Sequence, residues 1–280
     1  MMEGKDVKTS VREHYASIAR DGGNCCDAKA ARLGSCCGDP SPVGISKAIG
    51  YSDAEIRAVP DGANLGLGCG NPLAHAALRS GDVVVDLGSG AGFDCFLAAR
   101  RVGPGGHVIG VDMTHEMLAK ARENAARDGI DNVEFRLGEI ENLPVADGTA
   151  DMVISNCVIN LSTDKPRVFR EALRVLKPGG RLMVSDLVLA RPLPASVARS
   201  VSAYAGCIAG AMLKDDYLGA IRGAGFADVE VLAETSYPIG SSNPDASELA
   251  VLGDTSISKE DALAAAESVV SAKVTARRPG

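Results

Sequence analysis

The most constraining feature of this 280-residue chain is a short apolar segment that leads directly into a glycine-rich one, VVVDLGSGAG from Val83 to Gly92. The apolar residues are typical of a buried parallel strand, and the glycines let the backbone turn tightly and approach a ligand. Gly88, Gly90 and Gly92 lie at relative positions 1, 3 and 5, whereas the dinucleotide fingerprint needs 1, 3 and 6. Asp86 precedes the first glycine, and its carboxylate would repel a phosphate. The segment therefore predicts a site for an amino-acid cofactor that carries a positive charge.

Apolar segments and amphipathic segments alternate after residue 81, which predicts βαβ units and a parallel α/β sheet covered on both faces. Asp112 ends the second expected strand, where a carboxylate can accept hydrogen bonds from both hydroxyls of a ribose. Ser52 and Glu55 have the spacing of a capping box at the start of a helix. The expected strands are 82–86, 107–112, 133–137, 151–155, 181–186, 226–232 and 269–276, with a turn at 177–180, and the other expected helices are 6–20, 115–128, 166–176, 196–210 and 215–223.

Composition narrows the function classes. The chain is 46% hydrophobic and 23% charged, as in ordinary globular proteins. Its net charge is −7 and no dense Lys/Arg run occurs, so no nucleic-acid partner is expected. No apolar run reaches the roughly 20 residues of a membrane span, and the first residues are polar, so we expect a cytoplasmic protein without a membrane partner. Nothing in the sequence requires an oligomer, and a monomer is compatible with it.

The chain has eight cysteines, and in a reducing compartment these favour ligand binding or redox chemistry over a disulfide framework. Cys157 follows the fourth expected strand, at the sheet edge where such folds bind ligands. Cys69 lies in a glycine-rich loop and is expected to be exposed, and Cys207 lies in an Ala/Gly-rich segment. The three sulfurs would converge if the flanking segments fold over the crevice. Cys95, on the first expected helix after the glycines, is interpreted as a small buried hydrophobic residue.

Across residues 75–235 this motif set resembles the class I S-adenosylmethionine methyltransferases. The resemblance implies S-adenosyl-L-methionine as cofactor and a Rossmann-like sheet of seven strands, mostly parallel, with the last strand antiparallel. It also implies an N-terminal arm over residues 1–72, a cofactor-binding core over 73–190 and a C-terminal cap region over 191–280. The implied contacts are Asp86 and the three motif glycines near the amino-acid part, Asp112 on the ribose, Met113 flanking the adenine, Glu139 on the adenine amino group, the Ile140 backbone on an adenine ring nitrogen, and Asn156 beside the methionine part.

Three segments more closely resemble the arsenite methyltransferases: LGLGCGNP at 65–72, GFDC at 92–95 and SNCVINL at 155–161. This resemblance implies that Cys69, Cys157 and Cys207 hold trivalent arsenic, with arsenite or methylarsenite as substrate. It further implies a redox cycle that uses an N-terminal cysteine, either Cys36 or Cys37, and a thiol reductant such as thioredoxin or glutathione. For the other pair, Cys25 and Cys26, an auxiliary metalloid trap and no role at all both stay open.

The chemistry of a soft element agrees with this interpretation. Trivalent arsenic prefers thiolates to imidazoles or carboxylates. Three thiolates on one side leave its lone pair directed to the other, toward a methyl group that the enzyme holds at near-attack distance. Because arsenic loses no proton in the attack, no general base is required.

Two alternatives remain from the sequence. A small-molecule C- or O-methyltransferase of the quinone-biosynthesis kind would share the core, but it needs a base near the methyl group, for which His75 and Tyr204 are the weakly placed choices. A non-catalytic thiol protein that binds soft metals would explain the cysteine doublets but would not need Asp112.

Overall fold

The computed structural model describes residues 4–21, 41–236, 251 and 254–280. Seven strands form one sheet in the order β3-β2-β1-β4-β5-β7-β6. The pairs among β1 to β5 are parallel, whereas β7 runs antiparallel to both β5 and β6. This confirms the Rossmann-like α/β sheet with an antiparallel last strand. The strands are β1 (Val83–Leu87), β2 (His107–Asp112), β3 (Val133–Leu137), β4 (Ala150–Asn156), β5 (Leu176–Leu189), β6 (Ala227–Ser236) and β7 (Val269–Arg277).

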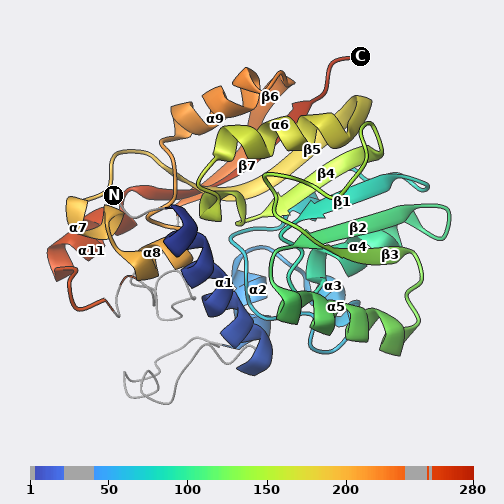
Figure 1. The fold of residues 1–280 in the computed structure, drawn as a ribbon, viewed down its shortest axis with the longest axis horizontal. Coiled ribbons are helices and arrows are strands. Elements are labelled where there is room, and N and C mark those ends of the chain that lie inside the picture. The colour runs from blue at the N-terminus through green and yellow to red at the C-terminus, as the bar shows by residue number, and fades with distance from the viewer. Residues whose placement is uncertain (1–3, 22–40, 237–250, 252–253) are drawn as a thin grey trace.

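Helices cover both faces of the sheet (Figure 1). Successive residues of a strand point to opposite faces, and the neighbours Val84 and Val85 accordingly belong to different cores. One face packs against α4 (Phe93–Val102) and α5 (His115–Asp128), and the other against α6 (Lys165–Val175) and α9 (Lys214–Gly223). Both faces of β1 and β4 are therefore buried, which explains why the inner parts of these strands, 83–85 and 152–154, are entirely apolar.

Helix α1 (Gly4–Asp21) confirms the amphipathic helix expected at 6–20 and packs between α5 and α8 (Val201–Ala205). Val7, Val11 and Ile18 are buried on its inner side, and Tyr15 is half-buried. The expected capping box is present, since the Ser52 side chain accepts from the Glu55 N–H and the Glu55 carboxylate accepts from the Ser52 N–H. The remaining elements are α2 (Pro42–Ala48), α3 (Asp53–Arg57), η2 (Pro72–Ala74), η3 (Ile159–Leu161), α7 (Ala195–Ala198) and α11 (Lys259–Ala266).

Two local predictions were wrong. The turn expected at 177–180 is part of β5, because Leu176 already pairs with Ala150. The single helix expected at 196–210 is two short helices, α7 and α8. Ser200 interrupts it by capping α8, as its hydroxyl accepts from the Ala203 N–H at 3.1 Å. Cys207 consequently lies in the turn after α8 and not on a helix.

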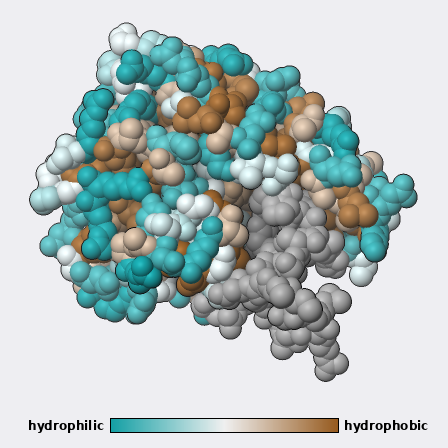
Figure 2. Space-filling model, turned by 180° about the vertical axis from the view of Figure 1, so that it is seen from behind, coloured by the Kyte–Doolittle hydropathy of each residue, from teal (hydrophilic) through white to brown (hydrophobic). Residues whose placement is uncertain are grey.

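The face of the molecule seen from behind is mostly hydrophilic, with small groups of hydrophobic residues between the hydrophilic ones (Figure 2). Within the described residues, no helix combines the length and the hydropathy needed to cross a bilayer.

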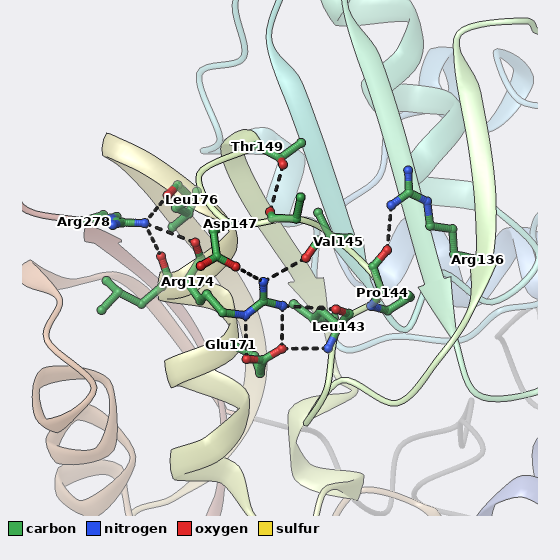
Figure 3. Close-up of polar contacts among 12 residues, drawn as sticks. Arg136, Leu143, Pro144, Val145, Asp147, Thr149, Glu171, Arg174, Leu176 and Arg278 are labelled. Atoms are coloured by element: carbon green, nitrogen blue, oxygen red, sulfur yellow. Dashed lines mark hydrogen bonds and ion pairs between the residues drawn. The ribbon is translucent and has the colours of Figure 1, made fainter.

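One arginine ties the loop between β3 and β4 to helix α6 (Figure 3). The Arg174 guanidinium forms a bidentate salt bridge with the Glu171 carboxylate at 2.7 and 2.8 Å and a further one with the Asp147 carboxylate at 2.5 Å. It also donates to the carbonyls of Val145 and Leu143 at 2.9 and 3.1 Å. A planar fork with this many acceptors is a geometry that lysine cannot reproduce.

We expect Arg174→Ala to lower the free energy of unfolding by about 2 kcal/mol, because several charge-assisted hydrogen bonds are lost together. Chemical denaturation checks this. The control is Arg191→Ala, which breaks the exposed Arg191–Glu267 ion pair and should change stability by less than about 0.5 kcal/mol. Equal stabilities of the two variants would contradict a structural role for Arg174.

Candidate active site

A pocket opens at the carboxyl ends of β1, β2 and β4. Helix α1 roofs it with Lys8 and Tyr15, and the loop 63–68 closes one side. Of the residues predicted from the sequence, those that line it are Asp86, Gly88, Gly90, Asp112, Met113, Ile140, Asn156, Cys157 and Cys207. Gly92, Glu139 and Cys69 are not part of the lining.

The glycine turn after β1 has little room for side chains. Gly88 has φ +70°, and a Cβ there would lie 2.4 Å from the Val158 side chain. The Gly90 N–H donates to one Asp112 carboxylate oxygen at 2.9 Å, and the Thr114 N–H donates to the other at 2.8 Å. The turn and the end of β2 are thus fixed to each other, with Asp112 at the pocket, and its contact with a ribose stays a prediction.

We expect Gly88→Ala to lower the free energy of unfolding by about 3 kcal/mol, since it adds both backbone strain and a steric clash. Thermal unfolding checks this. Gly105→Ala is the matched control, because its Cβ would have no neighbour within 4 Å and its φ is not in the left-handed region. If Gly88→Ala unfolded at the same temperature as the control, the turn would have accommodated the added methyl group, and the predicted strain and clash would be wrong.

Three acidic side chains crowd the same end of the pocket. Burial raises the pKa of Asp112 and raises the pKa of Asp94 to about 6. Burial and the neighbouring Asp94 charge raise the pKa of Asp86 well above its usual range. Lys8 also lines the pocket, but it pairs with Glu139 at 2.8 Å and Glu141 at 3.1 Å. The hydroxyl of Ser89 is buried there without a hydrogen-bond partner. This donor set fits a ligand with an ammonium or sulfonium group, whose positive charge would offset the carboxylates.

Glu139 differs from its expected position. Its carboxylate faces α1, where it pairs with Lys8 and lies 3.7 Å from Arg12. Its neighbours Gly138, Ile140 and Glu141 line the pocket instead. The adenine contact of Glu139 stays a prediction, and in this arrangement it would require the ion pairs to open.

Two predicted cysteines form a tight cluster with an acid that the sequence reasoning missed. The sulfurs of Cys69 and Cys157 and a carboxylate oxygen of Asp186 all lie within 4.8 Å of one another, and all three residues are buried. Cys207 is not part of that group among the described residues, but its thiol donates to the Cys157 carbonyl at 2.9 Å. The expectation that Cys69 is exposed was wrong: it is 3% exposed. The reason is that Ser271 of β7 and Asn156 of β4 bind its main chain at 2.6 and 3.1 Å.

The backbone is strained at two of these cysteines. Cys157 has φ +60° and Cys207 has φ +64°, a left-handed conformation that non-glycine residues adopt at a cost of about 1 kcal/mol or more. The Cys157 N–H donates to the Ser185 carbonyl at 2.8 Å, which holds the turn in place. Strain at two cysteines from distant segments favours a functional reason for their placement.

The surroundings of Cys69 and Cys157 disfavour the ionised form of their thiols, because they raise the pKa of both groups. The neighbouring Cys207 and Cys69 thiols, together with burial, raise the pKa of Cys157 well above its usual range. Burial likewise raises the pKa of Cys69. Tyr15 of α1 lies next to the third cysteine, with its hydroxyl 4.0 Å from the Cys207 sulfur. The described cysteines are free, whereas Cys25, Cys26, Cys36 and Cys37 lie outside the described residues.

Cys95 is separate from this cluster and agrees with its interpretation as a buried residue. It is 0% exposed on α4, and its thiol donates to the Asp86 carboxylate at 3.2 Å. The Asp86 contact adds a hydrogen bond that the sequence pattern did not reveal.

Neither side chain considered as a general base suits that role. His75 is exposed and does not line the pocket. The Tyr204 hydroxyl donates to the carbonyls of Leu161 and Ser162, both at 3.3 Å, and burial raises the pKa of Tyr204 to about 12. A base for proton abstraction works best with a pKa near neutrality.

The sheet order, the antiparallel last strand and the carboxylate-lined pocket at the strand ends together define a class I methyltransferase. A methyltransferase domain model matches residues 78–225, more than half of the chain. An arsenite methyltransferase of Halobacterium salinarum is 52% identical over 230 residues, which are 81% of this chain and 59% of that protein. One from Aquipseudomonas alcaligenes is 39% identical over 80% of this chain and 63% of that protein. The chain thus spans about three fifths of the length of these two curated relatives.

A solved structure adds a longer match. The crystal structure of an arsenic(III) S-adenosylmethionine methyltransferase from Chlamydomonas reinhardtii has 34% sequence identity and a TM-score of 0.62, and the match covers 84% of this chain and 73% of that one. The chain therefore belongs to the methyltransferase family and, within it, to the arsenite methyltransferases.

Proposed function

We propose that this protein transfers methyl groups from S-adenosylmethionine to trivalent arsenic, with arsenite or methylarsenite as substrate. The observation that carries the proposal is the convergence of three buried cysteines, Cys69, Cys157 and Cys207, beside a pocket whose other end is lined by carboxylates. Soft thiolate ligands select arsenic, and carboxylates select the cationic cofactor.

In this proposal, different pocket residues contact different parts of the cofactor. Asp86 and Asp94 would hold its ammonium group, Asp112 its ribose hydroxyls, and Met113 and Ile140 would flank its adenine. When bound, S-adenosylmethionine supplies the methyl group as part of a sulfonium. The role of the protein is then to fix the direction of approach and to exclude water, with Tyr15 and Lys8 of α1 above the site.

Arsenic capture requires no proton acceptor. Arsenite in its neutral form, As(OH)3, can exchange its three hydroxyl groups for the sulfurs of Cys69, Cys157 and Cys207. Three As–S bonds form, three As–O bonds break, and each thiol proton leaves with a hydroxyl as water. The raised pKa values of Cys69 and Cys157 suit this exchange, because a neutral thiol brings the proton that a departing hydroxyl needs.

The lone pair of the bound arsenic then becomes the nucleophile, and the new As–C bond formally raises arsenic from the trivalent to the pentavalent state. Two electrons must return before another methyl transfer. We propose that a dithiol supplies them by forming a disulfide, which thioredoxin or glutathione reduces. Cys36 or Cys37 would serve as the internal thiol.

The remaining attributes are also part of the proposal. A thiol-dependent enzyme works best in the reducing cytoplasm, where its thiols stay free, and we propose that location. We further propose that it acts as a monomer, with residues 1–72 as the arm, 73–190 as the cofactor core and 191–280 as the cap region.

The test is direct. Purified protein is incubated with S-adenosylmethionine, arsenite and a thiol reductant, and the arsenic species are separated by chromatography with mass detection. We expect methylated arsenicals and one equivalent of S-adenosylhomocysteine per methyl group. If arsenite stayed unchanged although the protein binds S-adenosylhomocysteine, the protein would still be a methyltransferase, but arsenic would not be its substrate.

A further inference from the structure

The loop that carries Cys69 is held by Ser271 of β7, whose hydroxyl donates to the Cys69 carbonyl at 2.6 Å, and on the side of the cofactor pocket by Asn156. The Asn156 side-chain oxygen accepts from the Cys69 N–H at 3.1 Å, and its nitrogen donates to the Gly70 carbonyl at 2.8 Å. These two bonds fix the peptide group before Cys69 and the one after Gly70. The Asn156 amide is therefore the contact through which the cofactor pocket can act on the Cys69 loop, while Ser271 and the Ser185 carbonyl hold Cys69 from the sheet.

The loop has no space in which to shift independently. A Cβ at Gly68 would lie 2.8 Å from the Asn156 amide, and one at Gly70 would lie 2.0 Å from the Ser185 hydroxyl. The backbone thus passes in direct contact with β4 and β5. A movement of Asn156 has to be transmitted to the loop, because a packed interior does not absorb it.

Asn156 is fixed in turn from its other side. Its side-chain nitrogen also lies 3.0 Å from the Tyr51 hydroxyl oxygen and 3.1 Å from the Asp94 carboxylate, and these two acceptors share its second hydrogen. The Tyr51 hydroxyl donates to the other oxygen of Asp94 at 2.6 Å, and its ring packs edge-on against Phe93 with centroids 4.8 Å apart. Tyr51 is 4% exposed, so this is a buried, closed network.

Asp94, Phe93 and Asn156 all line the pocket, whereas Tyr51 stands behind them. We infer that Tyr51 is a positioning residue that couples the two substrates: it holds Asp94 and Asn156 in the arrangement that a bound cofactor requires, and Asn156 passes this arrangement to Cys69. The inference rests on the proposed function, because it needs a cofactor at Asp94 and arsenic at Cys69. It assigns a role to Tyr51 that the cysteine and glycine motifs do not contain.

The expected sign of the coupling follows from charge and order. An ammonium group beside Asp94 keeps that carboxylate ionised, and an ionised carboxylate accepts the Tyr51 and Asn156 hydrogen bonds most strongly. The network then holds the Cys69 loop in place before arsenic arrives. Because coupling between two sites is reciprocal, bound arsenic must strengthen cofactor binding by the same factor.

Calorimetry can measure this factor without turnover. S-adenosylhomocysteine is titrated into the protein with and without saturating arsenite, and the ratio of the two dissociation constants is the coupling factor. We expect roughly a ten-fold factor in the unaltered protein, within the usual range for coupled sites, and less than about two-fold in Tyr51→Phe. 5′-Methylthioadenosine, which lacks the ammonium group, should show no coupling in either protein.

Tyr217→Phe is the matched variant. Tyr217 is also fully buried, and its hydroxyl donates to a buried carboxylate, Asp186, at 3.0 Å. Asp186 lies beside the cysteines and does not line the cofactor pocket, so this variant can change arsenite affinity but should keep the coupling factor. A merely structural effect of losing a buried hydroxyl would instead appear equally in both variants.

The outcomes separate the two hypotheses. If arsenite binds to the unaltered protein but does not change the affinity for S-adenosylhomocysteine, or if Tyr51→Phe keeps the full factor, the role of Tyr51 is wrong and the proposed function stands. If arsenite does not bind at all, the proposed function fails and the inference fails with it.

Discussion

Cys157→Ser is expected to lower the rate of arsenite methylation by about a thousand-fold or more, while the dissociation constant for S-adenosylhomocysteine stays within about two-fold. The serine hydroxyl is a hard ligand that holds trivalent arsenic poorly. Cys157 is also the central one of the three cysteines, since it lies beside both the Cys69 and the Cys207 thiols. Rates come from the chromatographic assay and affinities from calorimetry.

Cys95→Ser is the matched control, because it also exchanges a buried thiol for a hydroxyl, one that can still donate to Asp86. We expect this variant to methylate arsenite at close to the unaltered rate. If both serine variants turned over normally, the cysteine cluster would not be the arsenic site. If both lost methylation, the loss would be a general effect of removing a core thiol.

The sequence predicted those parts of the molecule whose signals are local. The segment from Val83 to Gly92 carries its strand, turn and helix start in ten consecutive residues, and the structure reproduces all three. Asp112 could be predicted for the same reason, because it directly ends an apolar strand and parallel strands end at one edge.

Contacts between distant segments could not be predicted in this way. Cys69 is buried because Ser271, 202 positions further along the chain, binds its carbonyl. Glu139 faces α1 because Lys8 and Arg12 attract it, and no strand motif contains those cations. Tyr51 and Asp186 carry no motif at all, and they become noticeable only when the fold places them beside Asn156 and the cysteines.

The cysteines show how the two kinds of information combine. The sequence pattern predicted that Cys157 follows the end of a strand. It did not predict the left-handed backbone, because a φ of +60° depends on the hydrogen bond from the Cys157 N–H to the Ser185 carbonyl. Such strain persists only where surrounding contacts over-determine it. The network of Asn156 on one side and the β5 backbone on the other supplies those contacts.

Asp112→Ala is expected to weaken the binding of S-adenosylhomocysteine by about a hundred-fold, because a charged acceptor contributes about 1.5–3 kcal/mol for each hydrogen bond to it. The control is Asp82→Ala, which removes an acid just before β1, away from the pocket, and should leave the affinity unchanged. Calorimetry measures both.

Asp112 also holds the Gly90 and Thr114 N–H groups, so weaker binding alone does not separate a ribose contact from a disturbed turn. The 2′-deoxyribose analogue of S-adenosylhomocysteine separates them, because it lacks one of the two hydroxyls. The unaltered protein should bind this analogue about ten-fold more weakly than S-adenosylhomocysteine, whereas Asp112→Ala should bind both ligands equally. A variant that still discriminates between the two ligands would mean that another residue reads the ribose, and that Asp112 acts only by fixing the turn.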